Sequence, residues 1–148
     1  MWSHANEATA GGRLALSCAI PKLPYKQDGK EYFVLDQEGG LVRGTLDLLI
    51  LKAVSWGPRH GYAVAEWIHA VTQRELLVEE GPLYTALHRL EKKGWLTSEW
   101  GVSESNRRAR YYRLNSAGRR QLRKEASLWE RYAHAISRAL AATVPTVA

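Results

Sequence analysis

Apolar residues recur with helical spacing between residues 80 and 94, and this stretch gives the clearest local prediction in the chain. Leu83, Leu87 and Leu90 fall at i, i+4 and i+7, so they share one face of a helix. Gly81-Pro82 suits the helix start, because a proline there loses only an N–H that would be unpaired anyway. Gly94 suits a left-handed C-terminal cap. The opposite face is polar and basic, with Tyr84, Thr85, His88, Arg89, Lys92 and Lys93.

Two short strands are predicted directly after this helix. Residues 96–102 and 110–114 are rich in aromatic and branched side chains, whereas the segment between them is polar and basic. Arg107, Arg108 and Arg110 repel one another there, and a phosphate backbone would relieve that repulsion. An amphipathic helix followed by a basic hairpin is the layout of a winged helix. We predict that the helix enters a DNA major groove, whose width admits one, and that the hairpin is the wing.

Two further helices are predicted upstream. The first begins near Gly44, with Thr45 as its N-cap and Asp47 in its first turn. It is apolar nearly all round over residues 46–54, so it should be buried on more than one side, with a partner subunit as one cover. The second begins at His60 or Gly61, with Val64, Ile68 and Val71 on its inner face, and a short strand at 76–78 follows. Three helices joined by tight turns make a helix-turn-helix core.

A long last helix is predicted from Asn115 or Ser116 to about residue 142. Six of its residues are spaced alternately four and three apart, as in a heptad seam: Leu122, Ala126, Trp129, Ala133, Ile136 and Leu140. At ~1.5 Å per residue the helix is roughly 40 Å long, too long for a domain this small to cover. We therefore predict a homodimer whose interface contains these six residues together with Leu48 and Leu51. The alternative is that the last helix packs wholly on its own first helix.

The predicted fold class is mainly α (α+β): a winged helix-turn-helix with a two-stranded wing and a long C-terminal dimerisation helix. A chain of 148 residues is expected to form one domain. We divide it into a DNA-binding domain at 41–114, a dimerisation helix at 115–142 and a tail at 143–148. Residues 1–40 lack helical periodicity and are rich in glycine and proline, so they are interpreted as a flexible N-terminal extension. The alternative is an accessory hairpin or arm, with a short strand at 31–35, that touches DNA or a partner.

Charge and composition favour a polyanionic partner. The formal charge is +6, and residues 107–124 hold eight basic side chains and no acidic one. The alternative for such a run is a solvated face. The chain has a single cysteine, so it cannot form an internal disulfide, and a reducing cytoplasm is favoured. No cluster of residues in the sequence has the spacing of metal ligands. No apolar run approaches the ~20 residues that cross a bilayer. Because no nucleophile elbow or phosphate-cradling glycine loop occurs, we predict no enzyme, metal or cofactor.

The predicted partner is double-stranded DNA. From the third helix we expect contacts by Tyr84, Thr85, His88, Arg89 and Lys92, and from the wing by Arg107, Arg108 and Arg110. For Tyr84 the alternative is a partly buried ring with its hydroxyl at the surface. The rival function is a basic nucleoid-type protein that binds DNA without reading its sequence. The affinity ratio between an operator and random DNA would distinguish the two.

Four segments, read together, resemble a known family: LVRGTLDLLILKAV, GPRHGYAVAEWI, VEEGPLYTALHRLEKKGWL and NRRARYYRLNSAGRRQL. They occur in the order seen in the PadR family of bacterial transcriptional regulators, and the resemblance covers about residues 41–140. It implies a winged helix-turn-helix followed by one dimerising helix, in the compact branch of the family. Residues 1–40 lie outside it.

Trp129 is a candidate ligand-binding residue. It lies in the middle of the predicted seam, with small residues, Ala126 and Ala133, on either side. A planar aromatic effector could stack beside it where two copies of the helix meet, and the family resemblance supports this interpretation. The alternative is core packing, in which the ring fills space against Leu48 or Leu51.

Overall fold

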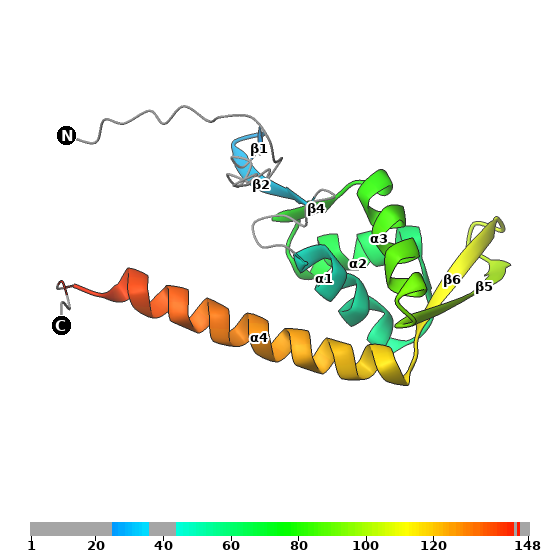
Figure 1. The fold of residues 1–148 in the computed structure, drawn as a ribbon. Coiled ribbons are helices and arrows are strands. Elements are labelled where there is room, and N and C mark those ends of the chain that lie inside the picture. The colour runs from blue at the N-terminus through cyan, green and yellow to red at the C-terminus, as the bar shows by residue number, and fades with distance from the viewer. Residues whose placement is uncertain (1–24, 36–43, 144, 146–148) are drawn as a thin grey trace, which may run out of the picture.

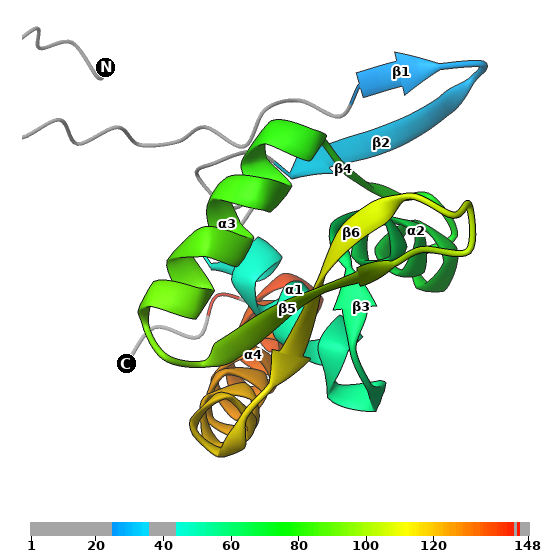
Figure 2. The same ribbon diagram turned by 90° about the vertical axis from the view of Figure 1, so that its right-hand side faces the viewer.

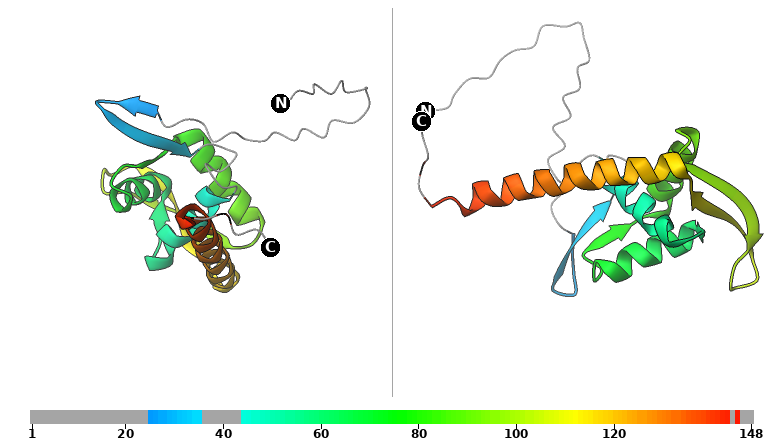
Figure 3. Two further views of the ribbon diagram at one scale, coloured as in Figure 1. Left: turned by 90° about the vertical axis from the view of Figure 1, so that its left-hand side faces the viewer. Right: turned by 90° about the horizontal axis from the view of Figure 1, so that it is seen from below.

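The computed structural model describes residues 25–35, 44–143 and 145, and it is a mixed α+β fold, as predicted (Figure 1). Three short helices form the body, a two-stranded hairpin stands at one side, and a long helix leaves the body in the opposite direction (Figures 1 and 3). The helices are α1 (Thr45–Ala53), α2 (Gly61–Val71), α3 (Glu80–Lys92) and α4 (Ser116–Ala141), with a 3-10 turn, η1, at Val54–Trp56. The strands are β1 (Tyr25–Gln27), β2 (Lys30–Leu35), β3 (Arg59–His60), β4 (Leu76–Val78), β5 (Leu96–Val102) and β6 (Arg108–Leu114).

Helix α1 is the centre of the core. Ile50, Leu51 and Ala53 are completely buried, because α2, α3 and the base of α4 all pack on this helix. Its N-cap is Gly44, which adopts a left-handed conformation with φ of 88°. Thr45, predicted as the cap, is instead the first helical residue.

The second helix begins where its sequence predicts. His60 is the N-cap of α2, and its Nδ1 accepts a hydrogen bond of 3.2 Å from the Ala63 N–H. Val64 and Ile68 are completely buried, whereas Val71, predicted on the same inner face, is 53% exposed at the helix end. His60 also ends β3, which pairs with β6, so the second sheet has the order β3-β6-β5.

The third helix is amphipathic as predicted. Leu83, Leu87 and Leu90 are buried, and Gly94 follows in the left-handed conformation with φ of 77°. The helix starts at Glu80, so the proline at position 82 is its third residue rather than its first. Helix α4 begins at Ser116, with Asn115 as the predicted cap, whose side chain accepts 2.8 Å from the Gly118 N–H.

The predicted boundary at residue 41 is wrong for residues 25–35. They form an antiparallel hairpin, and β2 adds parallel to β4, with Phe33 N–H donating 2.8 Å to Glu75 O. Leu35 is 1% exposed and belongs to the main core. The accessory-hairpin interpretation therefore describes this segment better than a flexible extension. The other predicted extension residues, 1–24 and 36–40, lie outside the described part of the chain, as do most of the tail residues.

Two predicted interface residues belong wholly or partly to the core of one chain. Leu51 is completely buried under α2 and α3, so its assignment to a subunit interface is wrong. Leu122 packs at the margin of the same core. Beyond it, α4 carries large exposed apolar side chains, so it does not pack wholly on α1: Leu128, Trp129, Tyr132, Ile136 and Leu140. None of the helices described here is long and apolar enough to cross a membrane.

Candidate nucleic-acid interface

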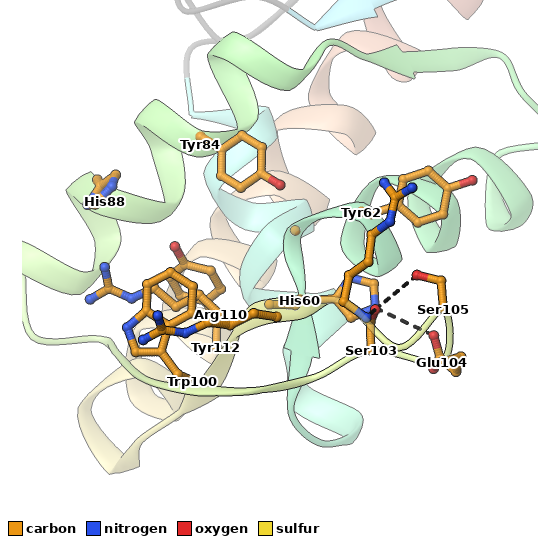
Figure 4. Close-up of a pocket in the computed structure, with 14 residues that line it drawn as sticks. His60, Tyr62, Tyr84, His88, Trp100, Ser103, Glu104, Ser105, Arg110 and Tyr112 are labelled. Atoms are coloured by element: carbon orange, nitrogen blue, oxygen red, sulfur yellow. Dashed lines mark hydrogen bonds and ion pairs between the residues drawn. The ribbon is translucent and has the colours of Figure 1, made fainter.

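An open cleft of about 790 Å³ lies between α3 and the β5–β6 hairpin; we call it the α3–hairpin cleft. Figure 2 looks onto this face, with α3 along one side and the two strands crossing in front of the body. Three elements line it: α3, the N-terminal end of α2, and the hairpin (Figure 4). The side chains that matter below are Tyr84 and His88 from α3, His60 and Tyr62 from α2, and Trp100, Arg107, Arg108 and Arg110 from the hairpin.

The outer face of α3 presents four of the five predicted DNA-contacting residues to solvent: Tyr84, Thr85, His88 and Lys92. Tyr84 is 43% exposed, and its ring projects into the cleft over the first turn of α2 (Figure 4). Gly61 makes this close approach possible, because a Cβ there would lie 2.9 Å from Tyr84 Cε1. The glycine therefore positions the tyrosine ring.

Arg89, the fifth residue, does not face the groove as predicted. Its guanidinium is paired with Asp47 through both carboxylate oxygens, one of them at 3.4 Å from Nε. Asp47 is only 9% exposed in the first turn of α1, and a buried carboxylate needs a cation. Arg89 thus fastens α3 to α1.

Arg110 is also engaged within the protein rather than free to grip a phosphate. Its Nη2 donates 2.8 Å to Glu91 Oε1 on α3, and its Nε donates 2.7 Å to Ser98 Oγ on β5. Ser98 Oγ in turn donates to the second oxygen of Glu91. These contacts brace the hairpin against α3 and set the shape of the cleft. Burial raises the pKa of the neighbouring Tyr112 phenol above its ordinary value, so this ring stays neutral.

Arg107 and Arg108 are exposed at the hairpin tip, where the prediction placed them. The turn is closed by Ser103 N–H donating 2.8 Å to Arg107 O, and Asn106 takes the left-handed conformation. The strands pair out to Val102 and Arg108, so Arg108 belongs to β6 rather than to the loop. Its guanidinium lies 4.3 Å from the centre of the Trp100 ring.

His60 joins α2 to the hairpin, a role that sequence reasoning missed. It is 7% exposed, and the Tyr111 ring meets it edge-on at 5.4 Å. Its Nδ1 accepts the capping bond, and its Nε2 lies 3.6 Å from Glu104 Oε2. Trp100 was missed too, although its alternation with Leu96 and Ser98 along β5 would have placed it on the core-facing side. No group of three or more potential metal ligands occurs among the described residues.

Three helices, a hairpin packed beside the third, and a basic cleft between them define a winged helix-turn-helix protein. The model of the transcriptional regulator PadR-like family matches residues 50–124, half of the chain. The chain therefore belongs to the PadR-like family, whose members are DNA-binding regulators of transcription and not enzymes.

Proteins similar to this chain include regulators of known structure and a relative found by its sequence. A transcriptional regulator from Clostridium thermocellum is 31% identical over 65% of this chain and 90% of that one, with a TM-score of 0.59. A PadR family transcription regulator from Clostridium difficile is 27% identical over 66% of this chain and 99% of that one, with a TM-score of 0.56. An uncharacterized protein X of Lysinibacillus sphaericus is 30% identical over 89 residues, 60% of this chain and 82% of that protein.

Gly61→Ala should weaken DNA binding without unfolding the protein. The new Cβ would displace the tip of the Tyr84 ring, which can swing away at little cost in stability but then leaves its place in the cleft. Loss of one well-placed contact predicts roughly tenfold lower affinity, measured by fluorescence anisotropy on duplex DNA. Gly81→Ala is the matched control, because nothing lies within 4 Å of a Cβ there. Equal affinity of the two variants would contradict a DNA-contacting role for Tyr84.

Proposed function

We propose that the protein is a homodimeric transcriptional repressor that acts in the cytoplasm on a pseudo-palindromic operator. The observation that carries the proposal is the α3–hairpin cleft, in which a polar helix face meets two exposed arginines, Arg107 and Arg108. A helix lying in the major groove has a phosphate backbone on each side of it, within reach of such arginines. Two copies related by a two-fold axis would meet half-sites about one helical turn apart. In this proposal residues 41–114 form the DNA-binding domain and α4 holds the dimer together.

A nucleoid-type protein that binds DNA without reading it remains the rival function, because its binding would use the same positive charge. The outer face of α3 favours sequence reading. Thr85 and His88 are exposed polar side chains that form no ion pair with any residue the structure describes, and such groups form hydrogen bonds with base edges. A large affinity ratio between the native promoter and random DNA is the expected result.

Replacing Arg107 and Arg108 together by alanine should weaken binding to every DNA sequence. Each exposed guanidinium is expected to neutralise one phosphate, so the slope of log affinity against log salt should fall by about two. Arg119→Ala with Arg120→Ala removes the same charge from exposed positions at the base of α4 and serves as the control. An unchanged slope in the Arg107/Arg108 variant would mean that the hairpin tip does not hold phosphates.

The homodimer is supported by apolar surface that one chain leaves uncovered. Ile136 is 44% exposed and Leu140 82% exposed, and both continue the heptad spacing of α4 beyond the body (Figure 3). Leu48, half-buried on α1, lies beside the same face of α4. A second α4 packed on this stripe would remove it from water, which is the usual fate of such a surface.

Ile136→Asp should dissociate the dimer. A carboxylate in a buried seam would cost on the order of several kcal/mol, and two copies would face each other across the axis. Sedimentation should therefore show monomer, whereas Ser137→Asp, at the next residue of α4, which is also exposed, should remain dimeric. A stable Ile136→Asp dimer would move the interface elsewhere.

We further propose that a small aromatic effector releases the protein from DNA. A cavity of about 430 Å³ lies between the start of α1 and α4, and Trp129 and Tyr132 line it with their ring centres 6.2 Å apart. Glu125 also lines this cavity, which favours a flat cation. The alternative is that the Trp129 ring only fills space against Leu48 or Leu51. Leu51 is completely buried and does not line this cavity, whereas Leu48 lines it together with Trp129. The 37% exposure of Trp129 favours a ligand over plain packing.

The ion pair between α1 and α3 would couple this cavity to the proposed DNA-binding face. Gly44, Thr45 and Leu48 line the cavity, and Asp47 in the same turn holds Arg89 of α3. A ligand that favoured one position of α1 would therefore shift the spacing of the two α3 helices in a dimer.

Planar cationic dyes should quench tryptophan fluorescence in the parent protein and much less in Trp129→Phe. The same dyes should weaken operator binding, because an effector acts only if it distinguishes the two states. Trp56→Phe is the control for an exposed indole outside this cavity. Quenching without any change in DNA affinity would remove the effector from the proposal and leave the repressor intact.

A further inference from the structure

The β5–β6 hairpin has an inner face that extends beyond the core. Side chains alternate along each strand, and the register places four pairs on this face: Leu96 with Leu114, Ser98 with Tyr112, Trp100 with Arg110, and Val102 with Arg108. The leucine pair is buried, and Ser98 and Arg110 of the next two pairs contact Glu91. Toward the hairpin tip the β5 side of this face is open, with Trp100 59% and Val102 64% exposed.

Trp100 and Arg108 form one unit on this open part. The guanidinium lies 4.3 Å from the ring centre, which is a favourable cation–π distance. Both residues line the α3–hairpin cleft, which Tyr84 and His88 of α3 also line. The unit thus offers a large apolar surface and a fixed positive charge at the same place.

A ligand matched to this unit needs an apolar face next to a negative charge. A deoxyribose with its phosphate has both, and its sugar can lie on the indole while the phosphate meets the guanidinium. When α3 occupies a major groove, the backbone that borders the groove passes between α3 and the hairpin. The positive charge of this cleft suits a phosphate, whereas nothing in its charge pattern favours a protein partner.

We propose that Trp100 and Arg108 together bind one sugar-phosphate unit of the DNA strand that passes through the α3–hairpin cleft. This inference rests on the proposed DNA-binding function and adds Trp100 as a contacting residue. The contact is made to the backbone, so it is independent of sequence and contributes equally to operator and random DNA.

The test uses a random-sequence duplex of about 30 base pairs, long enough for two half-sites. Trp100→Ala should bind it roughly tenfold more weakly, because a large ring no longer leaves water on binding. Arg108→Ala should also lower the salt slope by about one. The double variant should lose less than the sum of the two single losses, because the ring and the guanidinium act as one unit. Trp56→Ala is a close control: Trp56 is 69% exposed, has Lys52 Nζ 4.7 Å above its ring, and lies outside the cleft.

A second measurement, acrylamide quenching, uses Trp→Phe variants and does not depend on a variant losing its fold or its affinity for DNA. Acrylamide should quench the parent's fluorescence less when the duplex is present, and most of this protection should vanish in Trp100→Phe but persist in Trp56→Phe. Parent-like affinity of Trp100→Ala, or protection that survives in Trp100→Phe, would overturn the inference while DNA binding by α3 and the arginines stands. If the parent bound no duplex at all, the proposed function itself would fail.

Discussion

The burial of α1 is the constraint on which the rest of the structure depends. A nine-residue helix that is apolar over most of its circumference must be covered on more than one side. Helices α2, α3 and α4 all pack against it. This arrangement turns the polar face of α3 outward, because its leucines are buried in the core. The surface proposed to face DNA is thus a consequence of how the core is closed.

Ion pairs divide the four arginines that were predicted to contact DNA into two groups. Arg89 and Arg110 are held by Asp47 and Glu91, and they hold α3 in place against α1 and the hairpin. Arg107 and Arg108 lie at the tip, where the described carboxylate nearest in sequence, Glu104, faces His60 instead. Arg89 and Arg110 fix the shape of the cleft. Arg107 and Arg108 give it exposed positive charge to which a phosphate could bind. A cleft whose walls are already held by ion pairs would keep the cost of ordering low in the proposed DNA complex.

The two ends of the described chain extend this core in different ways. The β1–β2 hairpin adds a strand to β4 and contributes Leu35 to the core, so it is an integral part of the body. Helix α4 instead leaves the body and keeps an apolar stripe that a second chain would cover in the proposed dimer. The cavity beside Trp129 lies between α4 and the first turn of α1.

Local pattern in the sequence was enough to predict most helices, both hairpin strands, the buried leucines of α3 and the exposure of Tyr84, Thr85, His88, Lys92, Arg107 and Arg108. These features depend on neighbours within one or two turns or on strand alternation, which the chain displays directly. Only the tertiary structure decided which arginines are free, because the carboxylates that hold Arg89 and Arg110 lie 42 and 19 residues away. The same holds for Leu51, whose burial depends on helices that close around it, and for residues 25–35, whose strand pairs with one some 40 residues later. Pairings between distant segments leave no periodicity in the sequence, so the fold alone could assign them.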